Sequence, residues 1–308
     1  MPKIPREVLD AVIYLYPSRD AAEKVEGFGG TGFVVAIPGE LFPNHTIYYY
    51  AVTNWHVAVR EGHSTMRINT IDGGVDIFEY GPEEWHFDPR YDIAVLPFSM
   101  MPGKHKVSLI NSNIFVKSEI FSKDILGIGE DVFMLGRFID HDGGPTNAPA
   151  ARFGNLSLLP SPILQTNDRV ADSFCVDLHS RSGYSGSPVF IYRDRGFSLD
   201  LSNVTSTPDR TLDPPSLGRS YLGLLGIHWG QFSEAWEIVK GRAVPKKEAV
   251  SLDVEGQYVK GLSGMTCVLP AWCILEVLKM EKLRALREHH SRQEYAPFFA
   301  NGNPEMGI

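Results

Sequence analysis

Cysteine is scarce in this 308-residue chain, which contains only Cys175, Cys267 and Cys273. An odd and sparse set of thiols cannot form the disulfide framework of a small secreted domain, so we expect them to be reduced and partly buried. No C-x-x-C or H-x-x-x-H spacing occurs either, so the sequence predicts no metal site and no cofactor.

Long hydrophobic runs are also missing. The longest candidate, Cys267–Leu278, is interrupted by Pro270 and Glu276 and falls short of the roughly 20 residues that cross a bilayer. The start, Met1–Glu7, has no apolar stretch after its basic residues, which argues against a secretory signal. We therefore expect a cytoplasmic protein that does not enter a membrane.

An excess of basic residues is lacking as well. The formal net charge is −8, and no stripe of Lys and Arg offsets it. Because nucleic-acid binding depends on such stripes, we do not expect nucleic acid as a partner.

Helical periodicity is almost absent before residue 270. Short β-branched and aromatic runs separated by turn residues occur instead, a pattern typical of an all-β barrel or sandwich. The runs are Ala11–Tyr16, Thr31–Ile37, Thr46–Thr53, Ile93–Pro97, Lys106–Ile110, Asp131–Gly136, Asn155–Leu159, Ser173–Leu178, Gly186–Tyr192, Tyr221–Gly230 and Met265–Leu269.

Two segments depart from this pattern. Residues 193–219 are polar and contain three prolines, which predicts a surface insertion between two strands. From Ala271 to about Arg292, apolar residues recur mostly every three or four positions, which predicts a helix packed on the β-domain. The remainder, Ala296–Ile308, contains proline and glycine and is expected to be a loose tail.

The stretch Ser182–Phe190 places a serine between glycines just before a strand. Gly183 and Gly186 can adopt positive φ and hold a tight turn whose N–H groups converge on one point. Such a turn either is an ordinary hairpin connection or presents Ser185 as a nucleophile beside an oxyanion site.

Two further residues stand at the edges of predicted strands. His56 follows an aromatic strand, and Asp92 precedes a short apolar one. Alone, each has a structural explanation, as a buried histidine or a turn residue. Together with Ser185 they supply a nucleophile, a base and a carboxylate that orients the base.

Three segments carry a resemblance to trypsin-like (chymotrypsin-fold) serine proteases: Thr53–Val57, Asp92–Leu96 and Gly183–Pro188. Gly30–Val35 and Gly264–Pro270 are similar to segments of the bacterial Deg-type members. The resemblance spans roughly residues 10–280, with its segments in the family's order.

The resemblance implies two six-stranded antiparallel β-barrels with the active site between them, followed by the C-terminal α-helix. The expected peptidase domain covers residues 1–280, with an N-terminal barrel at about 8–125 and a C-terminal barrel at about 126–270. Residues 271–308 form the helix and tail. His56 is then the general base, Asp92 its orienting partner and Ser185 the nucleophile, with the N–H groups of Gly183 and Ser185 as the oxyanion hole.

The chain departs from the family in several places. Tyr184 stands where secreted digestive members carry an aspartate, so we expect no activation by zymogen cleavage. We also expect no second Deg-type domain after Pro270. His228 stands where the family usually has a small residue.

The family's pattern also implies a substrate pocket. Its floor matches His179, beside Ser180, and its substrate-aligning strand matches His228, Trp229 and Gly230. No carboxylate lies at the floor, which argues against cleavage after Lys or Arg and favours an acidic or polar side chain.

The leading hypothesis is a serine endopeptidase that hydrolyses protein or peptide substrates through an acyl-enzyme on Ser185. Two alternatives stay open. One is a protease-fold binding module without turnover, and the other is a latent protease that an activating protein partner switches on.

Overall fold

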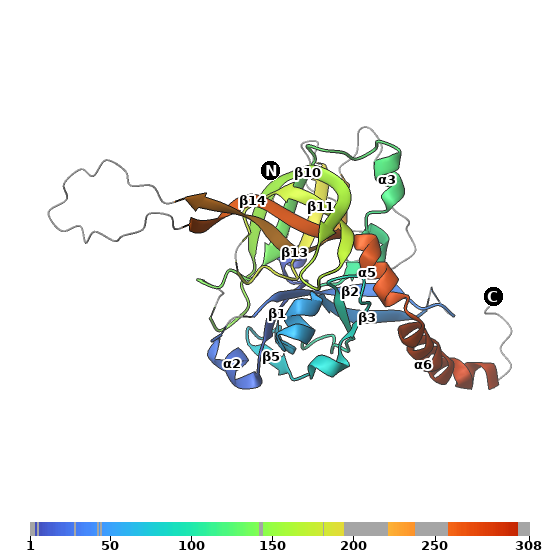
Figure 1. Ribbon diagram of the computed structural model, residues 1–308. Coiled ribbons are helices and arrows are strands. Elements are labelled where there is room, and N and C mark those ends of the chain that lie inside the picture. Colours follow the sequence, from blue (N-terminus) through green and yellow to red (C-terminus); the bar gives the residue numbers. More distant parts are fainter. Residues whose placement is uncertain are drawn as a thin grey trace.

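The computed structural model describes residues 4, 6–27, 29–41, 43, 45–141, 144–180, 182–193, 221–237 and 258–300 (Figure 1). Its strands are β1 Val12–Tyr16, β2 Thr31–Pro38, β3 Ile47–Thr53, β4 Thr65–Asn69, β5 Val75–Phe78, β6 His86–Phe87, β7 Ala94–Pro97, β8 Ile110–Asn111, β9 Asp131–Gly136, β10 Ala150–Leu164, β11 Val170–Asp177, β12 Pro188–Arg193, β13 Tyr221–Glu237 and β14 Tyr258–Pro270. Its helices are α1 Arg6–Leu9, α2 Arg19–Lys24, α3 Ser118–Ser122, α5 Ala271–Leu278 and α6 Glu281–Ala300, with short helical turns η1 His56–Arg60, η2 Pro82–Glu84 and η3 Ser112–Ile114. The predicted mostly-β fold with a helical C-terminal part is confirmed.

The first eight strands form one sheet in the order β5-β4-β1-β2-β3-β7-β6, with β8 pairing β2. Neighbours on this path are antiparallel, whereas β8 runs parallel to β2. Strands β6 and β8 are only two residues long, too short to extend a hydrogen-bonded ladder around a barrel. In the described part of the chain this sheet does not close, so a six-stranded N-terminal barrel is not confirmed.

The other six strands close into a barrel in the order β10-β11-β14-β13-β12-β9. This half has the strand number that was predicted. Its strand β12 is buried along five of six residues and begins with Pro188, a position where the missing N–H is tolerated. Closure removes free sheet edges, and the two long strands β13 and β14 extend beyond the barrel body (Figure 1).

The largest hydrophobic cluster joins the two halves. It contains buried side chains of the open sheet, such as Tyr14 and Val52, and of the barrel, such as Phe190 and Leu269. Ile274 of α5 belongs to the same cluster. The two halves therefore share a common core.

The C-terminal part forms two helices instead of the single predicted one. Lys279 caps α5, its N–H donating to the carbonyl oxygens of Leu275 and Val277. Helix α6 then starts at Glu281 and packs beside β3 (Figure 1). The predicted insertion at 193–219 lies outside the described residues except for Arg193, and so does the end of the predicted tail, residues 301–308.

Among the helices that the structure describes, none is both long and apolar enough to cross a membrane.

Candidate active site

His56 begins η1, three residues after the last residue of β3. The next residues, Val57 and Ala58, are buried in the core of the open sheet and so fix the turn in place. The carbonyl oxygen of His56 accepts the N–H of Glu61 at 2.9 Å, which closes the wide π-helical turn. The side chain of His56 is left 8% exposed.

Asp92 holds His56 at two points. Its Oδ1 accepts the backbone N–H of His56 at 2.9 Å, and its Oδ2 lies 2.6 Å from Nδ1 of the ring. The carboxylate is fully buried. Because a buried carboxylate accepts and does not donate, Nδ1 carries the proton and Nε2 keeps its lone pair. A histidine in this tautomer is ready to take a proton at Nε2.

Ser185 lies in the turn that leads into β12. Its neighbours Gly183, Tyr184 and Gly186 are buried, whereas Ser185 itself is half-buried. Gly183 has φ +93° and Gly186 has φ +86°. A Cβ at Gly186 would lie 2.0 Å from the carbonyl oxygen of Thr31, so only glycine fits there.

The N–H groups of this turn divide into two kinds. Those of Gly186 and Ser187 are used, each donating to a carbonyl oxygen at 3.0 Å. In the described part of the chain, those of Gly183 and Ser185 donate no hydrogen bond. They are therefore the pair available to an incoming acceptor.

Gly30 brings the Ser185 turn and η1 together. A Cβ on this glycine would lie 2.6 Å from Val57 Cγ1 and 3.0 Å from the Ser185 carbonyl oxygen, so both segments pack on one backbone position. Within the described residues no hydrogen bond joins the Ser185 hydroxyl to the His56 ring. Such contacts are often long in the absence of substrate and tighten on binding.

The structure brings only some of the predicted pocket residues into contact. Ser180 Oγ lies 2.8 Å from His228 Nε2, and both residues are buried. Trp229 turns its indole N–H toward Ser173 Oγ, at 3.1 Å. The ring of His179 is exposed and lies beside Gly264, at the surface of the barrel.

His228 is electrically coupled to the His56–Asp92 pair. Burial lowers the pKa of His228 to about 4, although the hydrogen bond that its Nδ1 donates to the Cys267 carbonyl oxygen partly opposes this shift. The charges of His56 and Asp92 act on this pKa in opposite directions. At neutral pH the side chain is therefore uncharged. Gly230, two residues after His228, faces open space, because a Cβ built on it would meet no atom within 4 Å.

The sequence did not predict that Gln165 and Thr166, in the turn between β10 and β11, contact Asp92. Gln165 Oε1 accepts the Asp92 N–H at 2.8 Å, and Thr166 Oγ1 donates to Asp92 Oδ2 at 2.5 Å. No pattern in the sequence pointed to them, since Gln-Thr-Asn-Asp between two strands has the composition of an ordinary turn.

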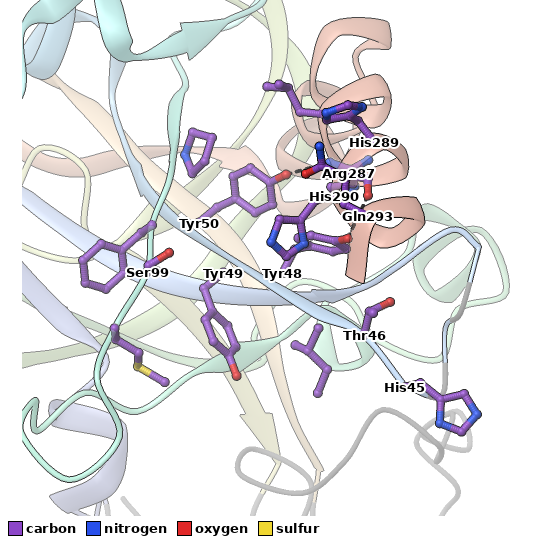
Figure 2. Close-up of a pocket in the computed structure, with 15 residues that line it drawn as sticks. His45, Thr46, Tyr48, Tyr49, Tyr50, Ser99, Arg287, His289, His290 and Gln293 are labelled. Carbon is purple, nitrogen blue, oxygen red and sulfur yellow. Dashed lines mark hydrogen bonds between the residues drawn. The ribbon is translucent and has the colours of Figure 1, made fainter. Parts of the chain in front are cut away.

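A surface groove of about 710 Å³ lies elsewhere, between β3 and α6 (Figure 2). Its walls include the tyrosines 48–50, Phe98 and several side chains of α6, among them Leu286 and His290. None of the predicted site residues lines it. In the part of the chain that the structure describes, no group of three or more His, Cys, Asp or Glu side chains is placed to hold a metal.

No protein-family model matches the chain, and no curated protein matches it. Among solved structures, Deg5 is 16% identical, with a TM-score of 0.42 over 73% of this chain and 81% of that one. The MamO protease domain from Magnetospirillum magneticum is 14% identical, with a TM-score of 0.45 over 89% and 98%. The active form of the Rv3671c protease from M. tuberculosis is 17% identical, with a TM-score of 0.42 over 90% and 86%.

The solved structures to which the chain is similar are thus trypsin-like serine protease domains of the HtrA and Deg type. With TM-scores below 0.5, these likenesses carry no argument about the chain, and its activity has to be argued from the geometry of its own residues.

Proposed function

We propose that the chain is a serine endopeptidase that acts through an acyl-enzyme on Ser185. The observation that supports the proposal is the pair of hydrogen bonds from His56 to Asp92, which leaves Nε2 of the ring unprotonated. The Ser185 turn and the helical turn that begins at His56 both pack on Gly30. A buried carboxylate bonded to Nδ1 is what a general-base histidine needs for a fixed tautomer and for charge stabilisation once it is protonated.

The proposed reaction follows from these groups. His56 Nε2 takes the hydroxyl proton as Ser185 Oγ attacks the carbonyl carbon of the substrate, and the oxyanion accepts the N–H groups of Gly183 and Ser185. His56 then gives its proton to the leaving amine, and an acyl-enzyme remains. Water, activated by the same histidine, hydrolyses the ester and restores the serine.

The proposed site lies between the open sheet, which supplies His56 and Asp92, and the barrel, which supplies Ser185. Substrate would be a peptide or protein segment bound along this edge. The three buried thiols are free, which supports a reducing compartment such as the cytoplasm.

We further propose that the pocket prefers an acidic or polar side chain. Ser180 and His228 supply a hydroxyl and an imidazole, and no carboxylate accompanies them in the predicted pocket set. Profiling with a peptide library tests this, and a dominance of Lys or Arg at the cleaved position would exclude it.

Replacement of Ser185 by Ala tests the proposed activity. We expect loss of fluorophosphonate labelling and a fall in peptide hydrolysis of at least about 10³-fold, because the attacking oxygen is removed. Ser182, an exposed serine of the same turn, gives the matched control Ser182→Ala, which should keep both signals. Wild-type protein that is neither labelled nor active on any peptide or ester would exclude the proposal.

A second candidate is a latent form of the same enzyme that a protein partner activates. The observation favouring it is the absence of a hydrogen bond between the Ser185 hydroxyl and His56 among the described residues. Labelling with and without cell extract separates the two, since only the latent enzyme gains labelling at Ser185 when extract is added.

A further inference from the structure

We propose that Thr166 is a positioning residue that acts through Asp92. The turn between β10 and β11 would supply a hydroxyl from the barrel that holds the carboxylate, and with it the His56 ring, in the orientation that proton transfer requires. The expected kinetic effect rests on the proposed protease function, whereas the positioning itself can be tested without turnover.

The hydrogen bonds of Asp92 carry the inference. In the described part of the chain, its carboxylate accepts from two residues, His56 and Thr166. Oδ2 receives both the ring N–H, at 2.6 Å, and the Thr166 hydroxyl, at 2.5 Å. Because the carboxylate is fully buried, the loss of a donor is costly.

The hydroxyl of Thr166 also lies 3.2 Å from Nδ1 of His56. It therefore packs against the ring at the point where the ring meets the carboxylate. A methyl group in its place would keep the volume but leave Oδ2 with a single donor, so rotation of the carboxylate away from Nδ1 becomes easier.

Hydrogen bonds to the segment that ends at Asp92 and to η1 fix the turn that carries Thr166. Gln165 accepts the Asp92 N–H through Oε1 and donates to the Arg90 carbonyl oxygen through Nε2, at 3.0 Å. Arg60, at the end of η1, donates to the Thr166 carbonyl oxygen at 2.8 Å. The turn thus bonds to the segment before Asp92 and to the helical turn that carries His56.

Among the described residues, two other polar side chains near this site, those of His228 and Asn54, do not donate to the Asp92 carboxylate. His228 bonds to Ser180 and to the Cys267 carbonyl oxygen. Asn54 donates its side-chain N–H to the main-chain carbonyl of Asp92, at 2.9 Å, and does not contact its carboxylate. Loss of the Thr166 hydroxyl should therefore weaken the positioning of the Asp92 carboxylate.

Thr166→Val is the test variant, with Thr166→Ser as the variant that restores the hydroxyl. Thr70→Val is the matched control, because Thr70 also donates to a carboxylate, Asp72 Oδ1 at 2.5 Å, but outside this site. We expect Thr166→Val to lower kcat about 10- to 100-fold with KM changed by less than about twofold, since Thr166 would act through Asp92 and not on substrate. The serine variant and the Thr70 control should stay within about threefold of wild type.

The second readout is the Nδ1 proton of His56, followed by NMR in protein with ¹⁵N-labelled histidine and assigned by its loss in His56→Gln. We expect exchange of this proton with water to be at least about tenfold faster in Thr166→Val and near wild type in Thr166→Ser. Thermal unfolding of each variant verifies folding, and Thr166→Ala replaces the valine variant if that one does not fold.

Unchanged proton exchange and unchanged kcat in Thr166→Val would overturn the inference. Equal losses in the valine and serine variants would also overturn it, because the hydroxyl would then not be the cause. A wild-type protein without hydrolytic activity would remove the proposed function but would leave the NMR comparison to decide on Thr166.

Discussion

His56 and His228 lie close enough to interact electrically but are held by different kinds of partner. The ring of His56 bonds to a carboxylate, which stabilises a positive charge, whereas His228 bonds to a hydroxyl and a carbonyl oxygen inside the barrel. Burial lowers the pKa of His228 to about 4 from an ordinary value of 6.5. His56 therefore has a partner for a positive charge, whereas His228 stays neutral at neutral pH.

The neutral state of His228 predicts a loss of stability in acid. Between about pH 6.5 and pH 4 the unfolded chain binds a proton at this position that the folded chain does not, so the free energy of unfolding falls as the pH falls through this window. The contribution reaches roughly 3 kcal/mol near pH 4. Urea unfolding from pH 7.5 to pH 4 should show a weaker pH dependence in His228→Gln than in wild type.

His289, an exposed histidine of α6, supplies the control. Its variant His289→Gln should keep the wild-type pH dependence. An equal fall in the free energy of unfolding between pH 7.5 and pH 4 in wild type and in His228→Gln would show that the buried imidazole does not cause the effect.

Helix α6 is attached to the open sheet through the buried guanidinium of Arg287. Arg287 is 2% exposed. It donates from Nε to both carboxylate oxygens of Glu40 at 2.9 Å, and from Nη1 to the Tyr50 hydroxyl and the Leu278 carbonyl oxygen at 2.9 Å each. Although burial opposes ionisation of Glu40, the hydrogen bonds and charge of Arg287 lower the pKa of that carboxyl. The same helix forms one wall of the groove in Figure 2.

Arg287→Met should loosen this helix. We expect the free energy of unfolding to fall by about 2–4 kcal/mol, because Glu40 and the Tyr50 hydroxyl lose their partner in a partly buried place. Arg292, an exposed arginine of the same helix, provides the control Arg292→Met, expected to change stability by less than about 0.5 kcal/mol. Urea unfolding measures both, and comparable losses would mean that Arg287 is not a specific anchor.

At the scale of the whole molecule, Thr31 joins the sheet to the barrel. Its hydroxyl donates to the Gly183 carbonyl oxygen at 2.6 Å and accepts the Arg137 N–H at 2.9 Å. Its own N–H donates to the Ser185 carbonyl oxygen at 2.8 Å. The Ser185 turn is thus positioned by a strand of the other half.

Thr31→Val should therefore impair stability and reactivity together. Two buried polar groups of the barrel lose their partner, which costs about 2–4 kcal/mol in free energy of unfolding. Because the Gly183 carbonyl is released, fluorophosphonate labelling of Ser185 should slow by at least about tenfold. Thr31→Ser, which keeps the hydroxyl, should restore most of both, and labelling at the wild-type rate in Thr31→Val would contradict the proposed coupling.

Much of the fold could be predicted from local patterns. Periodicity and turn residues indicated strands such as β2 and β3 and a helical C-terminal part, because burial on one or both faces leaves its mark on the residues themselves. Local patterns could not show that, among the described residues, the first sheet stays open while the second closes. Closure depends on pairing between distant strands and on the two-residue strands β6 and β8, which are too short to leave a pattern.

For the candidate site, the sequence was enough to propose His56, Asp92 and Ser185 in this chain order, with glycines where a Cβ would not fit. The residues that contact them became visible only in the folded chain. The contacts of Thr166 with Asp92 and of Thr31 with Gly183 span 74 and 152 residues along the chain. A threonine in a turn and one at a strand start have no local feature that distinguishes them, since these contacts arise from the packing of one half against the other.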